Sequence, residues 1–289
     1  MPSDMHIRPM SFPEMEILVS WAAAEGWNPG RHDASLFWAT DPAAFVAAEL
    51  DGELIGGGAI TCYQGEFGFM GFFIMRPEYR RQGLGNRLWH YRRDRLLARL
   101  RPGAPIGMDG VLPMESYYAA GGFVASHRDL RFCLDAGARP PASQSNETLV
   151  PLAEVPFDQV LAYDRSCFPA SRPNFLGPWI GQPDALALGC VRDGVLAGFG
   201  VIRRCSLGCR VGPLFADDAA AAGALLAAMA EFDATGPLFL DVPNNHSAAL
   251  EMVQRWGMYE VFACARMYLG PFPELAQERI FGVTSLELG

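Results

Sequence analysis

The residues most suited to chemistry are two glycines set among arginines, in the stretch Arg80-Arg81-Gln82-Gly83-Leu84-Gly85. Apolar residues precede this stretch like a strand, and a helical pattern follows it. At the start of a helix the first backbone N–H groups have no partner inside the helix, and the helix dipole is positive there. Glycines let an anion approach those amides, and arginines add charge in a geometry that suits phosphate. The stretch therefore predicts a pyrophosphate site, with an ordinary helix start as the alternative.

The overall composition is acidic. The chain has 289 residues, and 23 arginines against 32 aspartates and glutamates give a formal charge of −9; lysine is absent from the sequence. This balance argues against binding to nucleic acid or to anionic membranes. Eight arginines nevertheless lie between Arg80 and Arg101. We expect most of them on a solvated helix face, whereas Arg80, Arg81 and Arg87 are better placed for a ligand.

Cysteine and histidine usage indicates neither disulfides nor metal sites. The seven cysteines are an odd number and lie mostly in apolar, strand-like stretches, which is typical of free thiols in a reducing cytoplasm. The five histidines lack metal-ligand spacing. No signal peptide or membrane span is recognisable, because no apolar stretch approaches the roughly 18–20 residues that a span needs. We expect a cytoplasmic protein without a metal.

Alternating strand and helix patterns position the glycine stretch. Helices are expected at residues 11–24, from 84 to about 100, and from 113, with Ser11 and Glu14 forming a capping box at the first of these. Strands are expected at residues 5–10, 45–50, 54–63, 67–75, 106–111 and 123–134. The glycine stretch thus connects strand 67–75 to the helix that begins at residue 84.

The second half of the chain repeats the first. Residues 51–60 match residues 193–202 at six of ten positions, and Met108-Asp109 corresponds to Leu240-Asp241 at a similar offset. A repeat of this length is a whole domain. The stretch from 135 to 145 is rich in proline, alanine and serine. We therefore expect domains at 1–135 and 148–289, joined by a linker at 136–147.

With these elements in order, the first half resembles the GNAT superfamily of N-acetyltransferases. The family signature of arginine or glutamine, two residues, glycine, one residue, then glycine or alanine is matched by Arg80 to Gly85. The later strand, Tyr118 and the Gly122-Phe123 step follow in the family's order. The resemblance implies an α+β fold of two GNAT-like domains, each a mostly antiparallel, mixed and splayed sheet flanked by helices. With its second half as a diverged copy of the first, the whole chain resembles tandem GNAT proteins of bacteria.

The resemblance implies where acetyl-CoA binds. The glycine stretch would hold the pyrophosphate, and the end of the preceding strand would pair with the pantetheine amides. These cofactor-binding residues are Phe73, Ile74, Met75, Arg80, Arg81, Gln82, Gly83, Leu84, Gly85 and Asn86. Tyr118 falls where the family often places a tyrosine that protonates the departing thiolate. Tyr117 is the alternative if the register differs by one residue. The competing explanation for Tyr118 is that it packs in the core.

The proton acceptor and the substrate contacts do not stand at one set position in this family. A carboxylate is expected to take the proton of the acceptor amine. Asp109 is the first candidate, with Glu66 and Glu25 as alternatives, and a turn or cap explains Asp109 equally well. Substrate contacts are expected from an aromatic-rich set, for which packing is the competing explanation. This set is Trp27, Asn28, Trp38, Tyr63 and Phe67, with Phe37 also in the segment.

The second half departs from the family pattern at the glycine stretch. Asp217 and Asp218 stand there, where an aspartate caps the helix and repels phosphate, and Val253 takes the place of the tyrosine. We therefore expect one active site, with a second domain that is structural or forms a wall of the cleft. The predicted activity is acetyl transfer from acetyl-CoA to the primary amine of a small molecule, in a monomer or homodimer. An acyl-CoA sensor or scaffold without turnover, and a protein or peptide acetyltransferase, are the alternatives.

Overall fold

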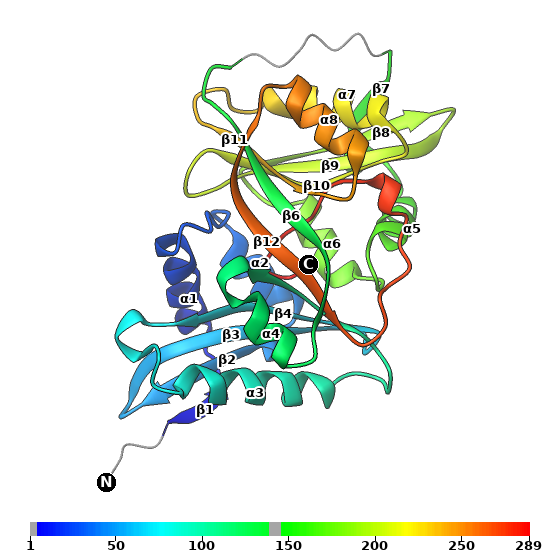
Figure 1. The fold of residues 1–289 in the computed structure, drawn as a ribbon. Helices are drawn as coiled ribbons and strands as arrows, with labels where there is room; N and C mark the ends of the chain where they lie inside the picture. The colour runs from blue at the N-terminus through cyan, green and yellow to red at the C-terminus, as the bar shows by residue number, and fades with distance from the viewer. Residues whose placement is uncertain (1–4, 139–145) are drawn as a thin grey trace.

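The protein is described here by a computed structural model of residues 5–138 and 146–289 (Figure 1). Most of the predicted linker, 136–147, lies outside the described residues. All seven cysteines fall within them and are free thiols. None of the helices in these two ranges is long and apolar enough to cross a membrane.

The elements of the first half lie close to their predicted positions. Its strands are β1 (His6–Pro9), β2 (Phe45–Leu50), β3 (Glu53–Tyr63), β4 (Phe67–Met75), β5 (Ile106–Val111) and β6 (Val124–Leu134). Its helices are α1 (Phe12–Ala24), α2 (Asp33–Thr40), α3 (Leu84–Leu97) and α4 (Glu115–Ala120). The predicted capping box forms at α1, where the backbone N–H of Ser11 donates to the Glu14 carboxylate at 2.8 Å.

The second half has the same order of elements. Its strands are β7 (Thr148–Pro151), β8 (Ala185–Arg192), β9 (Val195–Arg204), β10 (Cys209–Ala216), β11 (Leu238–Pro243), β12 (Tyr259–Leu269) and β13 (Ile280–Gly282). Its helices are α5 (Phe157–Cys167), α6 (Pro173–Ile180), α7 (Ala219–Ala230) and α8 (Ser247–Arg255). The repeated Asp-Gly turns agree in conformation, with φ of 53° at Asp51 and 51° at Asp193.

The two halves share one sheet because each contributes one of its strands to the other. β6 pairs with β11 of the second half, and β12 pairs with β5 of the first. β6 and β12 also pair with each other and run side by side through the middle of the molecule (Figure 1). The strand order is β1-β2-β3-β4-β5-β12-β6-β11-β10-β9-β8-β7. Each half of the sheet is therefore completed by a strand that lies far away in sequence.

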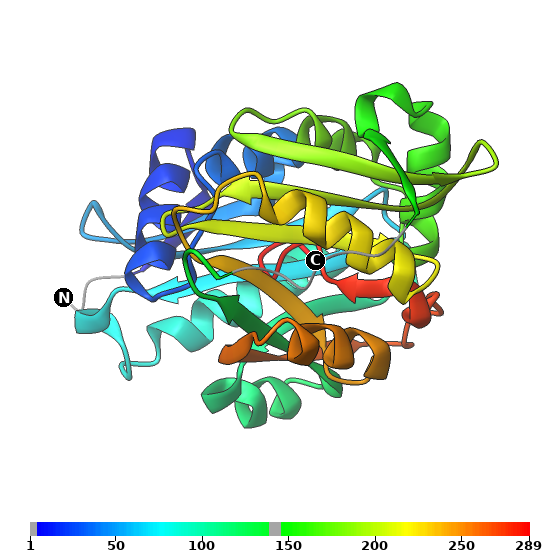
Figure 2. The same cartoon turned by 90° about the horizontal axis from the view of Figure 1, so that it is seen from above.

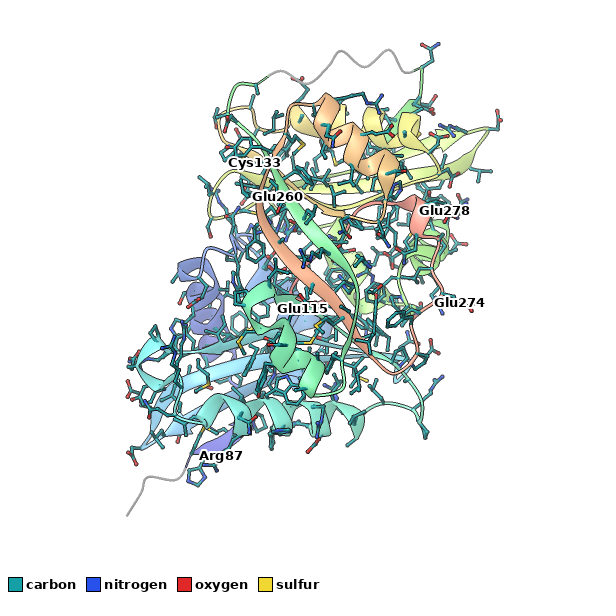
Figure 3. The ribbon with its side chains drawn as sticks, in the orientation of Figure 1. Arg87, Glu115, Cys133, Glu260, Glu274 and Glu278 are labelled. Carbon is teal, nitrogen blue, oxygen red and sulfur yellow. The ribbon has the colours of Figure 1, made fainter. Side chains whose placement is uncertain are left out.

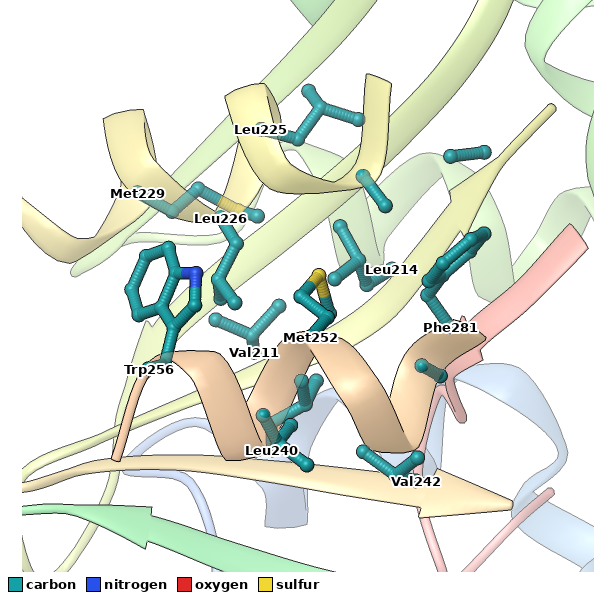
Figure 4. Close-up of a cluster of buried hydrophobic side chains, with 14 of the residues drawn as sticks. Val211, Leu214, Leu225, Leu226, Met229, Leu240, Val242, Met252, Trp256 and Phe281 are labelled. Carbon is teal, nitrogen blue, oxygen red and sulfur yellow. The ribbon is translucent and has the colours of Figure 1, made fainter. Parts of the chain in front are cut away.

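Helices cover both faces of each half of the sheet. In the first half, α1 and α2 bury one face with Met15, Leu18 and Phe37, and α3 and α4 bury the other with Leu88 and Tyr118. In the second half, α7 and α8 pack against β10 and β11 through the cluster in Figure 4, which includes Leu225, Met252, Val211 and Leu240. Phe281 of β13 points into the same cluster and anchors that strand (Figure 4).

Two parallel strand pairs open like a V, one in each half. β4 and β5 pair only at Gly68–Ile106 and Phe69–Gly107, and then part. β10 and β11 pair from Cys209 to Val211 and then part as well. β13 fills the second opening: it pairs with β10, and the N–H of Val283 donates to the carbonyl of Asp241 in β11 at 2.9 Å. Within the described residues, no strand fills the opening between β4 and β5.

The exchange of β6 and β12 predicts that neither half folds alone. Fragments 1–138 and 146–289, expressed separately, would leave β5 and β11 with unpaired backbone edges and exposed apolar faces. We expect neither fragment to show cooperative thermal unfolding by circular dichroism. Mixed during refolding, the two should form a 1:1 complex with a single transition. A cooperative transition in either isolated fragment would contradict the structural dependence inferred here.

Candidate active site

A bulge in β4 creates the opening beside β5. Between the pairs Ala59–Gly71 and Gly57–Ile74, β4 has one residue more than β3, and Phe72 has a φ of 51°. Such a bulge bends the strand and re-aims its backbone groups. Beyond Phe69, β4 therefore turns away from β5 and presents to the gap a backbone edge that β5 does not pair with. Phe73, Ile74 and Met75, predicted to pair with pantetheine, lie on this edge.

A buried arginine of α3 stabilises the bulge through hydrogen bonds to backbone carbonyls. Arg92 of α3 donates through Nη2 to the carbonyls of Ala59 and Gly71, and its guanidinium lies 5.2 Å from the Phe73 ring centroid. A Cβ at Gly58 would lie 2.5 Å from the Arg92 guanidinium carbon, so glycine there makes room for it. Burial lowers the pKa of Arg92 to about 10. Arg92 is therefore an exception to the expectation that most arginines of this stretch lie on a solvated helix face.

The glycine stretch forms the turn into α3 as predicted. Gly83 is the N-cap residue, with a φ of 81° and open space where a side chain would be, and Arg81 has a φ of 61°. In the described residues, no side chain caps this helix end. The first amides of α3 are therefore available to an anion. Gly85 packs against β4, where its Cβ position is 3.4 Å from Met75 Cγ.

Side-chain hydrogen bonds from an arginine and a glutamine hold the turn before this helix start. Arg80 donates from Nε to the carbonyl of Met75 at 2.8 Å and pairs through Nη2 with Glu25 at the end of α1. Gln82 donates to the carbonyl of Glu78 at 2.7 Å, which holds the turn in shape. Glu25, an alternative candidate for the proton acceptor, is thus an ion-pair partner of this loop.

The corresponding turn in the second half is closed. Asp218 caps α7 by accepting hydrogen bonds from the N–H groups of Ala220 and Ala221, both at 3.0 Å. Its carboxylate is also paired with Arg192, and this pair lowers the pKa of Asp218 to about 2. A second barrier is the strand β13 itself, which occupies the gap between β10 and β11. The cap was expected from the aspartates at this turn, whereas the strand in the gap was not expected.

A cavity lies at the point where β4 and β5 part, and both halves build its wall. The space between the atoms, including its open mouth, is about 550 Å³. The first half contributes Trp27, Met70, Gly71, Phe72, Phe73, Met108, Asp109, Val111, Tyr118 and Arg131, and the second half Phe262, Cys264, Leu286 and Glu287. Arg131 and Phe262 also line an outer groove that reaches Asn28 and Tyr259. The cavity therefore connects the strand gap to the surface.

Tyr118 enters the cavity from the face covered by α3 and α4. Its ring packs on Gly110, where a Cβ would lie 2.7 Å from Tyr118 Cδ2. Burial raises the pKa of the Tyr118 hydroxyl to about 12, although Arg92 nearby opposes the shift. Tyr117, the alternative, instead donates its hydroxyl proton to Asn86 Oδ1 at 2.8 Å and is not among the residues that line the cavity.

Asp109 lies in the cavity wall but is already engaged. Arg266 of β12 donates to both of its oxygens, at 2.6 and 2.7 Å, and lies 3.4 Å from Asp129. Burial raises the pKa of Asp109 well above its usual value, Asp129 acts in the same direction, and Arg266 opposes both. Glu66, another candidate, pairs with Arg101.

For three of the five predicted substrate residues the structure corrects the prediction. Tyr63 is buried and donates its hydroxyl proton to the carbonyl of Leu288 at 2.8 Å. Phe67 is buried against Phe168, with ring centroids 5.5 Å apart. Trp38 packs on Phe12 and Phe45. Aromatic packing explains these three side chains, and the described cavity wall does not include them.

The other two predicted substrate residues, Trp27 and Asn28, lie where the halves meet. Trp27 lines the cavity, and its carbonyl accepts from Arg131 at 2.8 Å. Asn28 clamps the turn at Leu207 of the second half, accepting from its N–H at 2.7 Å and donating to its carbonyl at 2.9 Å. Asn28 therefore holds one edge of the outer groove in place.

Known proteins share this architecture and these sequence features. Models of the GNAT acetyltransferase family match residues 12–104 and 160–282, one in each half. A holothin acyltransferase from a Pseudoalteromonas species is 27% identical over 284 residues, which are 98% of this chain and 94% of that protein. The crystal structure of a Pyrococcus horikoshii protein has a TM-score of 0.83 at 22% identity and is matched over 99% of this chain and 96% of its own. A tandem GNAT protein from the clavulanic acid biosynthesis pathway has a TM-score of 0.63 at 15% identity, over 93% and 100%. The chain therefore belongs to the GNAT acetyltransferase family, as a tandem protein whose second half is degenerate.

Proposed function

We propose that this protein transfers an acetyl group from acetyl-CoA to the primary amine of a small molecule, by direct attack in a ternary complex. One observation carries the proposal: the open gap between β4 and β5 joins the uncapped start of α3 to the cavity that contains Tyr118. Pyrophosphate would bind the amides of residues 82–86. Pantetheine would pair with the edge of β4 at Phe73–Met75, which faces the gap, and its thioester would then reach the cavity.

Tyr118 is the proposed general acid. As the amine displaces CoA, the thiolate leaves toward the face that α3 and α4 cover, and the phenol supplies its proton. A phenol with a pKa of about 12 stays protonated at neutral pH. That value lies above the range of an ordinary thiol, but the same apolar surroundings also destabilise the thiolate, so the gap between the two pKa values narrows.

The residues that line the cavity favour a small acceptor with an apolar surface. Trp27, Phe72 and Phe262 offer flat apolar surfaces, and two carboxylates in the wall suit an amine. The related Pseudoalteromonas protein is named an acyltransferase, which supports acyl transfer without deciding between acetyl and longer chains.

Calorimetry should show one acetyl-CoA bound per chain. In Gly83→Glu, a side chain at φ of 81° strains the turn and places a negative charge at the anion site. We expect its affinity to fall at least about tenfold, which corresponds to 1.4 kcal/mol.

Two variants control this experiment. Gly194→Glu adds the same charge at a similar φ of 78°, in a hairpin of the second half with open space around it, and should leave the affinity unchanged. Asp218→Ala removes the cap of α7, yet the stoichiometry should stay at one because β13 still occupies the gap. Two sites in the wild type, or full affinity in Gly83→Glu, would contradict the proposed acetyl-CoA site.

Release of CoA thiol across a panel of amines tests the activity itself. We expect Tyr118→Phe to lower kcat about 100-fold or more with acetyl-CoA affinity unchanged, because only proton transfer is lost. The wild-type rate should show no alkaline decline from Tyr118 below about pH 10, since the pKa of its hydroxyl is about 12.

Tyr117→Phe is the matched control, because it removes a neighbouring hydroxyl that donates to Asn86. It should keep most of kcat. An unchanged kcat in Tyr118→Phe would exclude this residue as the acid, and an absence of thiol release with every amine would favour a binding protein without turnover.

A further inference from the structure

The C-terminal segment brings a second carboxylate into the cavity. After β13 the chain continues into the middle of the molecule, where Thr284, Ser285, Glu287 and Leu288 are buried (Figure 2). A Cβ at Gly71 would lie 1.7 Å from the carbonyl oxygen of Glu287, so the main chain of Glu287 lies directly against β4 beside the bulge. The site where the thioester is expected is therefore next to this residue.

The carboxylate of Glu287 is only half satisfied. The residue is 4% exposed, and its Oε1 lies 3.4 Å from Nη2 of Arg210. Its Oε2 is buried and has no hydrogen-bond partner in the described part of the protein. An unpaired buried carboxylate oxygen is costly, because it has lost the hydrogen bonds of water. A ligand N–H at this point in the cavity would satisfy it.

The other candidates for proton acceptor are committed elsewhere. Both oxygens of Asp109 accept from Arg266, Glu25 pairs with Arg80, and Glu66 pairs with Arg101. Among the described residues that line the cavity, Asp109 and Glu287 are the acidic ones. Glu287 is therefore the carboxylate with an oxygen available.

Glu287 and Tyr118 approach the gap from opposite faces. Leu288, adjacent to Glu287, belongs to the cluster that α1 and α2 form, whereas Tyr118 belongs to the cluster of α3 and α4. Both side chains line the same cavity. An amine that enters beside Trp27 would thus meet a base on its own side of the thioester and an acid on the side of the sulfur.

We propose that Glu287 accepts the proton of the acceptor amine, an inference that rests on the acetyl transfer proposed above. The amine nitrogen forms a bond to the thioester carbon, and the carbon–sulfur bond breaks. The proton on nitrogen passes to Oε2 of Glu287, and the thiolate takes the phenolic proton of Tyr118. The products are the N-acetyl amine and CoA thiol. Return of the proton from Glu287 to Tyr118 through solvent restores the site.

The test is the pH dependence of kcat/KM in Glu287→Gln, measured with an arylamine that is already neutral at neutral pH. The substrate then contributes no acidic limb of its own. We expect the wild type to show an acidic limb that is lost in Glu287→Gln, with kcat/KM lower by about 100-fold or more and acetyl-CoA affinity unchanged. Added formate should restore part of the rate in Glu287→Ala.

Controls separate a catalytic base from a structural residue. Glu274→Gln, an exposed position of the same C-terminal region at the outer edge of the molecule, should behave as wild type (Figure 3). Glu287→Asp keeps a negative charge near Arg210 and replaces Glu287→Gln in the test if that variant does not fold. It should retain the acidic limb, with a lower kcat/KM. A folded Glu287→Gln that keeps the limb, or a Glu287→Ala that formate leaves unchanged, would overturn the inference. A wild type inactive toward every amine would instead contradict the proposed function itself.

Discussion

Two parallel strand pairs that part after a few residues impose the constraint on which the rest of this structure depends. Backbone N–H and C=O groups need partners once they are away from water, so each opening has to be filled. In the second half β13 fills it, with hydrogen bonds to β10 and β11. In the first half the opening remains for a ligand, beside a helix start without a side-chain cap. The second half has thus filled with its own chain the space that corresponds to the proposed acetyl-CoA site of the first half.

The C-terminal segment serves both openings. Residues 280–283 lie in the gap of the second half, and a few residues later Glu287 lies against Gly71 in the wall of the first. The degenerate half therefore does more than support the sheet, because it positions the part of the chain that closes the cavity. Exchange of β6 and β12 has a similar effect, since Arg266 of β12 pairs with Asp109 of β5.

Local patterns were enough to predict much of the fold. Strands 67–75 and 106–111 were predicted at their observed bounds because apolar strand patterns end at clear turn signals, and the glycine stretch adopts the predicted turn. Contacts between distant segments were out of reach. The burial of Arg92 depends on the space left at Gly58, and the place of Glu287 depends on the path of the chain after β13. Tyr63 and Phe67 were misassigned because an aromatic residue looks the same in a sequence whether it lines a pocket or packs in a core.

Buried charges between the halves fix where the proposed base lies. Arg210 lies 3.8 Å from Asp33, 3.7 Å from Asp241 and 3.4 Å from Glu287, and Asp33 also pairs with Arg203 at 3.0 Å. Burial favours the neutral form of Asp33, yet the two arginines hold its pKa below the usual range. Such pairs contribute little net stability, but a partner out of place leaves an uncompensated charge. The network therefore restricts the halves to one register, and through Arg210 it restricts the carboxylate of Glu287 to one side of the cavity, opposite Tyr118.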